Sequence, residues 1–268
     1  MNSAAAGLAS VLELEHVDAA DGAFRALFDV SLEVEAGSAV ALVGANGAGK
    51  SSVARVASGL VVPTAGRVLV AGQDLTGAPA HRFARAGIAH APEGRAVFAT
   101  LTVEDNLLLA FRNAPEITDA RASVAEAFDL FPRLGERRGQ LAGTLSGGEQ
   151  RMLTLARVLV LRPRLLVADE LSLGLAPLVT AEVYQTLRRV RDAGCALLIV
   201  EQHLDHALEL ADEVVVIRKG EVGFRGAPQD AAALSQSILL PSGHPAATDT
   251  DTEPAGSPAA EPPPPEVN

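Results

Sequence analysis

Apolar side chains recur along most of the chain in short runs, and their spacing predicts where strands lie. Apolar and polar residues alternate in "LFDVSLEVEAG" from Leu27, whereas "SAVALVG" at residues 38–44 is apolar nearly throughout. Alternation is typical of a strand with one buried face, and a continuous apolar run is typical of a strand buried on both faces. By the same criteria, further strands are expected to begin at Val11, Arg67, Arg164, Cys195 and Glu213.

Helical patterns separate several of these strands. The clearest cover residues 50–60, 149–160, 178–191 and 204–212, and residues 92–143 are mainly helical, most plainly in "VEDNLLLAF" and "SVAEAFDLF". Strands that alternate with helices favour an α/β fold with a mainly parallel core sheet. We therefore expect one α/β domain over residues 10–238, with a helical subdomain inserted at about residues 92–147.

Composition changes at the two ends of the chain. Residues 1–9 are mostly alanine and other small residues, and a flexible N-terminus is expected there. From Pro241 onward the chain holds eight of its 16 prolines, five acidic residues and no Lys or Arg, so a disordered tail is expected over residues 239–268. Residues 1–240 then carry −6 of the net charge of −11. An acidic balance argues against nucleic acid as a partner, because phosphate backbones are bound by clustered Lys and Arg.

Other features of the sequence indicate in which cellular compartment the protein is expected. The single cysteine, Cys195, begins an apolar run and is expected in the core, and one cysteine excludes a disulfide framework. The first ten residues lack the basic and apolar regions of a signal peptide. No uncharged apolar run approaches the roughly 18–20 residues that cross a bilayer. Any membrane role would therefore depend on a partner.

A glycine-rich segment between a predicted strand and a predicted helix is the first candidate site. The sequence "GANGAGKS" at residues 44–51 fits G-x-x-x-x-G-K-[ST], and its position after a buried strand is the context that this motif requires. Backbone N–H groups of such a loop bind phosphate oxygens, the lysine reaches the β- and γ-phosphates, and the hydroxyl ligates Mg²⁺. The residues expected to bind nucleotide here are Gly44, Ala45, Asn46, Gly47, Ala48, Gly49, Lys50, Ser51 and Ser52.

Two acidic residues end another predicted strand. Asp169 and Glu170 follow four apolar residues in "LLVADE". A strand ending in Asp-Glu is by itself most often a solvated turn, but beside a phosphate loop it is expected to be catalytic. Asp169 would then lie near Mg²⁺, and Glu170 would polarise the attacking water as general base.

A second helix start has the features of an anion site. In "LSGGEQ", residues 145–150, Ser146 is a candidate N-cap, Gly147 and Gly148 leave room for a phosphate, and Glu149 lies in the first helical turn. One chain therefore carries two candidate phosphate-binding helix starts, about a hundred residues apart.

The phosphate loop, "LSGGEQ" and the strand ending in Asp-Glu, in this order, resemble the ATP-binding subunits of ABC transporters over roughly residues 10–235. The resemblance implies a P-loop NTPase fold: a mainly parallel core sheet, an antiparallel N-terminal β-subdomain and a helical subdomain. It also implies ATP and Mg²⁺ as cofactors. Two such subunits, identical or different, would form a head-to-tail dimer in which Ser146, Gly147, Gly148 and Glu149 of one serve the nucleotide bound to the other.

The same resemblance implies a membrane complex. The helical subdomain would dock on permease subunits at the cytoplasmic face of the membrane, and a solute-binding protein would act indirectly. "PEGRAVF" at residues 92–98, "SLGLAP" at 172–177 and "FPRLGERR" at 131–138 resemble the branched-chain amino acid import ATPases in particular. In most ABC ATPases a glutamine contacts Mg²⁺ and the attacking water at the position of Glu93, and this subfamily has glutamate there.

The sequence departs from the family at three places. Asp21 stands where an aromatic residue usually stacks on adenine; Phe24 is a candidate replacement or, equally, a core residue. Leu171 replaces a proline, which we expect to loosen that turn. At residues 201–206, "EQHLDH", alignment puts Gln202 in place of the usual histidine that contacts the γ-phosphate. Gln202 is therefore the expected phosphate sensor, His203 at most supports it, and His206 is expected on the helix surface.

Other functions remain open from the sequence. ATPases of urea- or amide-type importers are close relatives of the branched-chain subfamily. A non-transport ABC ATPase could act as a regulatory clamp, although this chain has one ATPase unit and no long coiled coil. A module that binds nucleotide without hydrolysing it is the third alternative, and measuring ATP turnover beside nucleotide affinity separates it from an enzyme.

Overall fold

Two sheets form the framework of the protein. The computed structural model describes residues 9–22, 24–94, 96–114, 117–202 and 205–231. An antiparallel sheet has the strand order β2-β1-β4-β5. Its strands are β1 (Ser10–Asp21), β2 (Phe24–Glu35), β4 (Ala65–Val70) and β5 (Gln73–Asp74). The second sheet has six strands in the order β10-β9-β3-β8-β7-β6 and is parallel except for the β9–β10 pair. It consists of β3 (Ala39–Val43), β6 (Ile88–Ala91), β7 (Leu165–Asp169), β8 (Ala196–Glu201), β9 (Glu213–Arg218) and β10 (Glu221–Gly226).

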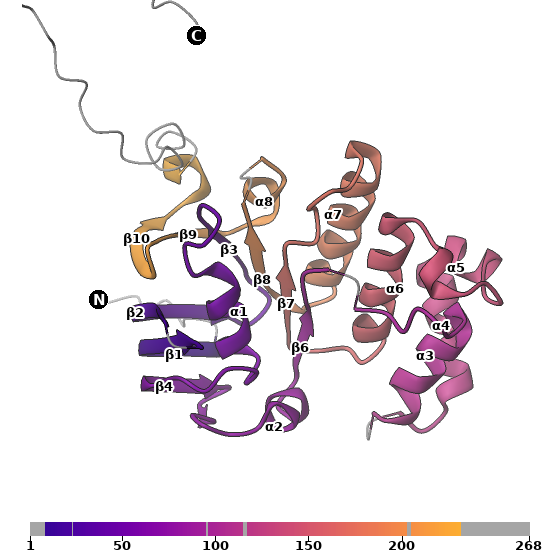
Figure 1. Ribbon diagram of the computed structural model, residues 1–268, viewed down its shortest axis with the longest axis horizontal. Coiled ribbons are helices and arrows are strands. Elements are labelled where there is room, and N and C mark those ends of the chain that lie inside the picture. Colours follow the sequence, from indigo (N-terminus) through magenta and orange to yellow (C-terminus); the bar gives the residue numbers. More distant parts are fainter. Residues whose placement is uncertain (1–8, 23, 95, 115–116, 203–204, 232–268) are drawn as a thin grey trace, which may run out of the picture.

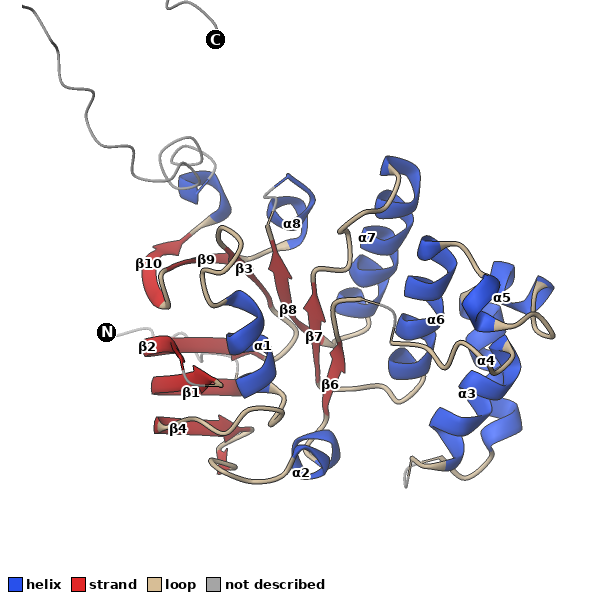
Figure 2. Cartoon of the chain, viewed as in Figure 1, coloured by secondary structure: helices blue, strands red, loops and turns tan. Residues whose placement is uncertain are grey.

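Helices cover both faces of the six-stranded sheet, and a further group of helices lies to one side of it (Figures 1 and 2). The helices flanking the sheets are α1 (Lys50–Ala57), α2 (Ala80–Arg85), α6 (Gly147–Leu159), α7 (Pro177–Asp192) and α8 (Asp205–Leu210). At the end away from the antiparallel sheet lie α3 (Val103–Arg112), α4 (Ala120–Leu130), α5 (Pro132–Glu136) and the short 3₁₀ helix Ala142–Thr144. This is the α/β architecture that the sequence predicted, with both kinds of sheet.

Strand β3 shows how the two faces are built. All five of its residues are buried, as expected for a strand covered on both faces. Ala39, Ala41 and Val43 belong to the core that contains α6 and α7. Val40 and Leu42 point the other way, into the core shared by α1 and the antiparallel sheet. The strand therefore separates α1 from α6.

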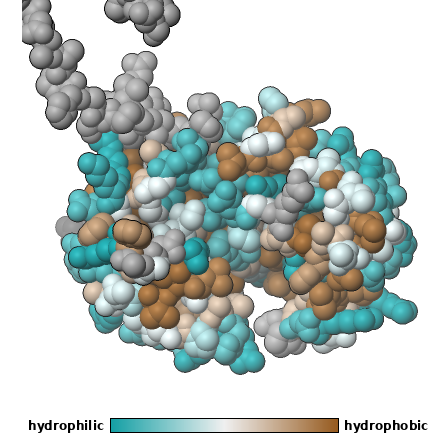
Figure 3. Space-filling model, viewed as in Figure 1, coloured by the Kyte–Doolittle hydropathy of each residue, from teal (hydrophilic) through white to brown (hydrophobic). Residues whose placement is uncertain are grey.

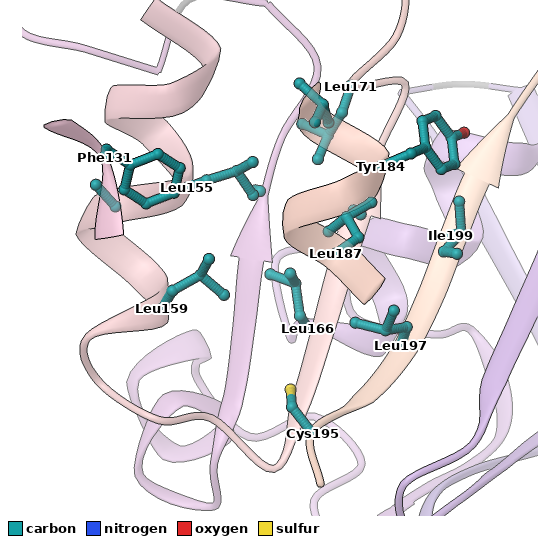
Figure 4. Packing of buried hydrophobic residues seen from close by; sticks show 14 of the residues in the cluster. Phe131, Leu155, Leu159, Leu166, Leu171, Tyr184, Leu187, Cys195, Leu197 and Ile199 are labelled. Atoms are coloured by element: carbon teal, nitrogen blue, oxygen red, sulfur yellow. The ribbon is translucent and has the colours of Figure 1, made fainter. Parts of the chain in front are cut away.

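The core beneath α6 and α7 is made of aliphatic side chains from two strands (Figure 4). Leu166 of β7 and Leu197 of β8 pack against Leu187 of α7 and Leu159 of α6. Cys195 lies in the same cluster with 8% of its surface exposed, and burial raises the pKa of its thiol to about 11. The expectation that Cys195 is a core residue is confirmed.

Some elements were not predicted, and some predicted segments lie outside the described residues. Strands β5, β6 and β10 and helix α2 are absent from the prediction. Strands β5 and β6 have only two and four residues, and β10 has two large apolar residues, Val222 and Phe224, among charged residues and glycines. Helix α1 ends at Ala57 rather than Leu60, since Gly59 adopts a φ of 69° just after it. The expected tail at residues 239–268 and residues 1–8 lie outside the part of the chain that the structure describes.

Candidate active site

The phosphate loop joins β3 to α1 and curls tightly at Gly49. This residue has a φ of 107°, in the left-handed region that side chains disfavour. A Cβ atom there would also approach the carbonyl oxygen of Ala26 to 2.9 Å. Only glycine fits this position. The resulting turn aims the first N–H groups of α1 into the loop, which is the geometry of an anion site.

The lysine of this loop is buried and bonded to a carboxylate. Lys50 is 4% exposed, and its Nζ atom lies 3.1 Å from Oε1 of Glu170 and 3.3 Å from the carbonyl oxygen of Ala45. The ion pair joins the start of α1 to the end of β7, 120 residues further along the chain. The structure therefore brings the predicted phosphate loop and the predicted carboxylates into one site.

Asp169 shares this site with other acidic groups. It is 3% exposed, and the Ser51 hydroxyl donates to its Oδ1 atom at 3.5 Å. Burial and the charges of Glu170 and Glu93 raise the pKa of Asp169 to about 6, although Lys50 and Ser51 oppose the shift. Carboxylate and hydroxyl oxygens are the ligands that Mg²⁺ prefers. The described residues contain no group of three His, Cys, Asp or Glu side chains placed to hold a metal ion. A cation bound by Ser51 and Asp169 would therefore take phosphate or water as further ligands.

Glu93 follows β6 and is exposed. Its loop is held by Arg151 of α6, whose guanidinium donates to the carbonyl oxygens of Gly94 at 2.8 Å and Pro92 at 3.4 Å. Arg151 is 7% exposed, and burial lowers the pKa of its guanidinium. The sequence did not identify this residue. It directly follows "LSGGEQ", but nothing in the pattern shows that its side chain spans to a loop 57 residues away.

The "LSGGEQ" segment forms the predicted N-terminus of α6. The Glu149 N–H donates to the Ser146 hydroxyl at 3.3 Å, and the Ser146 N–H donates to the Glu149 carboxylate at 2.9 Å. This capping box satisfies two backbone groups at the helix start. A Cβ atom on Gly148 would come within 2.3 Å of Val179, so the close approach of α7 requires glycine. Because α6 and α1 cover opposite faces of the sheet, one chain does not place this segment over its own phosphate loop.

The end of β8 carries the expected phosphate sensor. Gln202 directly follows this strand, whose last residue pairs with Val43 at the start of the phosphate loop. His203 lies outside the described residues. His206 of α8 is half-buried, so only part of its side chain lies on the helix surface where it was expected, and its ring centroid is 5.2 Å from that of Tyr184.

Phe24 lies at the start of β2, near the phosphate loop. It is 81% exposed, which excludes the core position that the sequence left open. The carbonyl oxygen of Ala26, two residues further along β2, and the side chain of Leu27 lie close to Gly49. An exposed aromatic side chain thus lies on β2 two residues before the backbone segment that approaches the phosphate loop. Asp21 pairs with Phe24 across the β1–β2 hairpin.

Comparisons with known proteins agree with this geometry. Residues 27–172 match the family model described as ABC transporter. The chain is 41% identical over 212 residues to the high-affinity branched-chain amino acid transport ATP-binding protein BraG of Pseudomonas aeruginosa, covering 79% of this chain and 91% of that one. It is 36% identical to a probable branched-chain amino acid transport ATP-binding protein of Archaeoglobus fulgidus, covering 75% and 85% of the two chains. A lipopolysaccharide export ATP-binding protein of Escherichia coli is 30% identical, with coverage of 77% and 86%.

Solved structures show the same fold. A nucleotide-free ATP-binding cassette from an ABC transporter superimposes with a TM-score of 0.75 at 25% identity, covering 85% of this chain and 95% of that chain. Another cassette, in its ADP conformation, gives 0.74 at 26% identity with the same coverage.

The raised pKa of Asp169 predicts that this carboxylate destabilises the free protein. An unfolded Asp ionises near pH 4 and the folded one near 6, so the folded state binds more protons and the free energy of unfolding falls as pH rises between these values. Asp169→Asn should therefore raise the free energy of unfolding at pH 7.5 by up to about 3 kcal/mol, and by almost nothing at pH 4.

Denaturant unfolding in EDTA without nucleotide measures this effect, with the exposed Asp129→Asn as the matched control. Equal or lower stability of Asp169→Asn at pH 7.5 would contradict the prediction.

Proposed function

Because the chain belongs to the ABC transporter family of ATP-binding proteins, we propose that it is the ATP-hydrolysing subunit of a branched-chain amino acid importer. The curated relatives named for that transport support the choice of solute. The observation that carries the catalytic proposal is the buried contact between Lys50 of the phosphate loop and Glu170 at the end of β7. A binding module without hydrolysis would not need a carboxylate at this place.

The phosphate loop and the start of α1 would hold the nucleotide. Backbone N–H groups of residues 44–52 would face phosphate oxygens, and the Lys50 ammonium lies between the loop and Glu170. The oxygen donors of Ser51, Asp169 and Glu93 fit Mg²⁺, which when bound neutralises charge on the phosphates. Phosphate oxygens would also compete with Glu170 for Lys50. Nucleotide binding would then free the Glu170 carboxylate to accept a proton from water.

Gln202 completes the catalytic groups. Its amide can donate a hydrogen bond to the γ-phosphate but cannot carry a proton or a positive charge. Sensing by Gln202 would therefore depend on geometry and not on protonation.

A second ATPase subunit is needed to complete each site. ABC ATPase subunits work as dimers with membrane permease partners. Here Ser146, Gly147, Gly148 and Glu149 lie on the opposite sheet face from the phosphate loop, which supports their acting on nucleotide held by the partner subunit. Contacts that exist only in the ATP-bound pair would favour closure, and hydrolysis would reverse it.

The permease would contact the side of the molecule where a cleft separates α2 from the helical subdomain. This cleft, of about 740 Å³, opens at the lower edge of Figure 3 and has β6 at its floor. Its ionisable lining residues are all basic: His81, Arg85, His90, Arg162 and Arg164. None of the helices in the described part of the chain has the length and apolar content needed to cross a bilayer. Contact with permease subunits at the cytoplasmic face would thus provide the membrane association.

Replacing the general base tests the proposed function. Glu170→Gln should lower ATP turnover by roughly 10²–10⁴-fold, because it removes the proton acceptor, and should leave ATP binding intact. Turnover is measured with Mg²⁺ for the subunit alone and with its permease, and the exposed Glu221→Gln is the control. Wild-type protein without Mg²⁺-dependent turnover in either setting would refute the function, and unchanged turnover in Glu170→Gln would remove Glu170 from its role.

An exposed Phe24 should stack on the adenine base. Phe24→Ala should weaken ATP binding by roughly 5- to 150-fold, equivalent to about 1–3 kcal/mol for a base–aromatic stack. Titration with a fluorescent ATP analogue measures this loss. Phe98→Ala removes another exposed aromatic side chain, outside the site, and should not change the affinity. If both variants bind alike, Phe24 does not contact the base.

Comparing two single substitutions tests whether Gln202 or His203 is the phosphate sensor. Gln202→Ala should abolish most hydrolysis because the γ-phosphate loses a hydrogen-bond donor, whereas His203→Ala should retain it. Single-turnover hydrolysis of bound ATP measures both. The reverse result would place the sensor one residue later in the chain.

A further inference from the structure

Glu201 is a buried carboxylate with no assigned role. It is the last residue of β8 and only 3% exposed. Three groups donate to it: the Ser172 hydroxyl at 2.8 Å, the Ser172 N–H at 3.2 Å and the Tyr184 hydroxyl at 3.2 Å. Burial raises the pKa of this carboxyl group, and the three hydrogen bonds oppose the shift. Burying a charge is costly, so a carboxylate placed here needs an explanation beyond packing.

The same strand end also holds the catalytic glutamate. The backbone N–H of Glu170 donates to the carbonyl oxygen of Val200 at 2.8 Å. Consecutive residues of β8 therefore bind residues 170 and 172, on either side of Leu171, which is 1% exposed. Glu170 has a φ of 46°, a left-handed conformation that a non-glycine residue keeps only when its surroundings impose it.

The remaining contacts extend this arrangement to α7 and α6. Tyr184 belongs to α7, so its hydroxyl fixes the carboxylate from the helix side. The Leu175 N–H donates to the carbonyl oxygen of Ser172 at 3.2 Å, and the Leu175 side chain lies where a Cβ atom on Gly147 at the start of α6 would meet it at 3.8 Å. Ser172 therefore belongs both to the turn that follows Glu170 and to the segment that leads to Leu175 and the start of α6.

We infer that Glu201 is a positioning residue for hydrolysis: it holds Ser172 and thereby fixes the turn that aims Glu170. This inference rests on the proposed function. Hydrogen bonds to a charged acceptor are roughly twice as strong as neutral ones, so a carboxylate holds the turn more rigidly than an amide of the same shape. Glu201 does not touch the nucleotide site itself. Its loss should change the rate of the chemical step and leave nucleotide binding unaffected.

Steady-state ATP hydrolysis and ATP affinity, measured on the same preparations, test the inference. Glu201→Ala should lower kcat by roughly ten- to a hundredfold, the effect of misplacing a catalytic group by about 1 Å, with the Kd for ATP unchanged within about twofold. Glu201→Gln keeps one acceptor oxygen and should recover part of the loss. Ser172→Ala and Tyr184→Phe each remove one of the hydrogen bonds to Glu201, and each should lower kcat by a smaller factor. These two variants still test the inference if Glu201→Ala does not fold.

Asn106→Ala is the matched control. Asn106 is fully buried in α3, and its side chain bonds the backbone of Phe98, Leu101 and Thr102. Its replacement should lower stability and leave kcat per folded molecule unchanged. The inference is overturned if the Glu201, Ser172 and Tyr184 variants keep wild-type kcat, or if kcat and affinity fall together. Lack of turnover in the wild type would instead contradict the proposed function.

Discussion

A buried ion pair between Lys50 and Glu170 is the contact on which the site depends, because each of these groups is costly to bury alone. The pair is possible because β3, β7 and β8 are parallel and end at the same edge of the sheet. Three segments therefore converge there: the phosphate loop after β3, the carboxylates at the end of β7, and Glu201 with Gln202 at the end of β8. The fold thus gathers charged side chains at one edge of the parallel sheet, next to a core of aliphatic side chains.

Most of the framework could be predicted because its elements are long and periodic. The buried run at residues 38–44 and the helical pattern at residues 178–191 became β3 and α7. Strand β6 has four residues, two of them half-buried, so neither period nor length distinguishes it. The tertiary structure defines it, by pairing it with β7 at the edge of the sheet.

Some residues of the candidate site could also be predicted from the sequence, and others could not. Lys50, Asp169 and the N-cap at Ser146 were predictable, because the sequence motif that identifies each of them spans only a few residues. Arg151 and Glu201 were not, since their partners are 57 and 29 residues away. The exposure of Phe24 was likewise undetermined until the pairing of β1 with β2 placed it at the hairpin end.

The placement of α1 and α6 on opposite sheet faces has a genetic consequence. If two copies of this chain form the proposed dimer, each would contribute half of each of two composite sites. In that dimer, a copy with a damaged phosphate loop would still supply an intact "LSGGEQ" to its neighbour, so two differently damaged copies would form one working site between them.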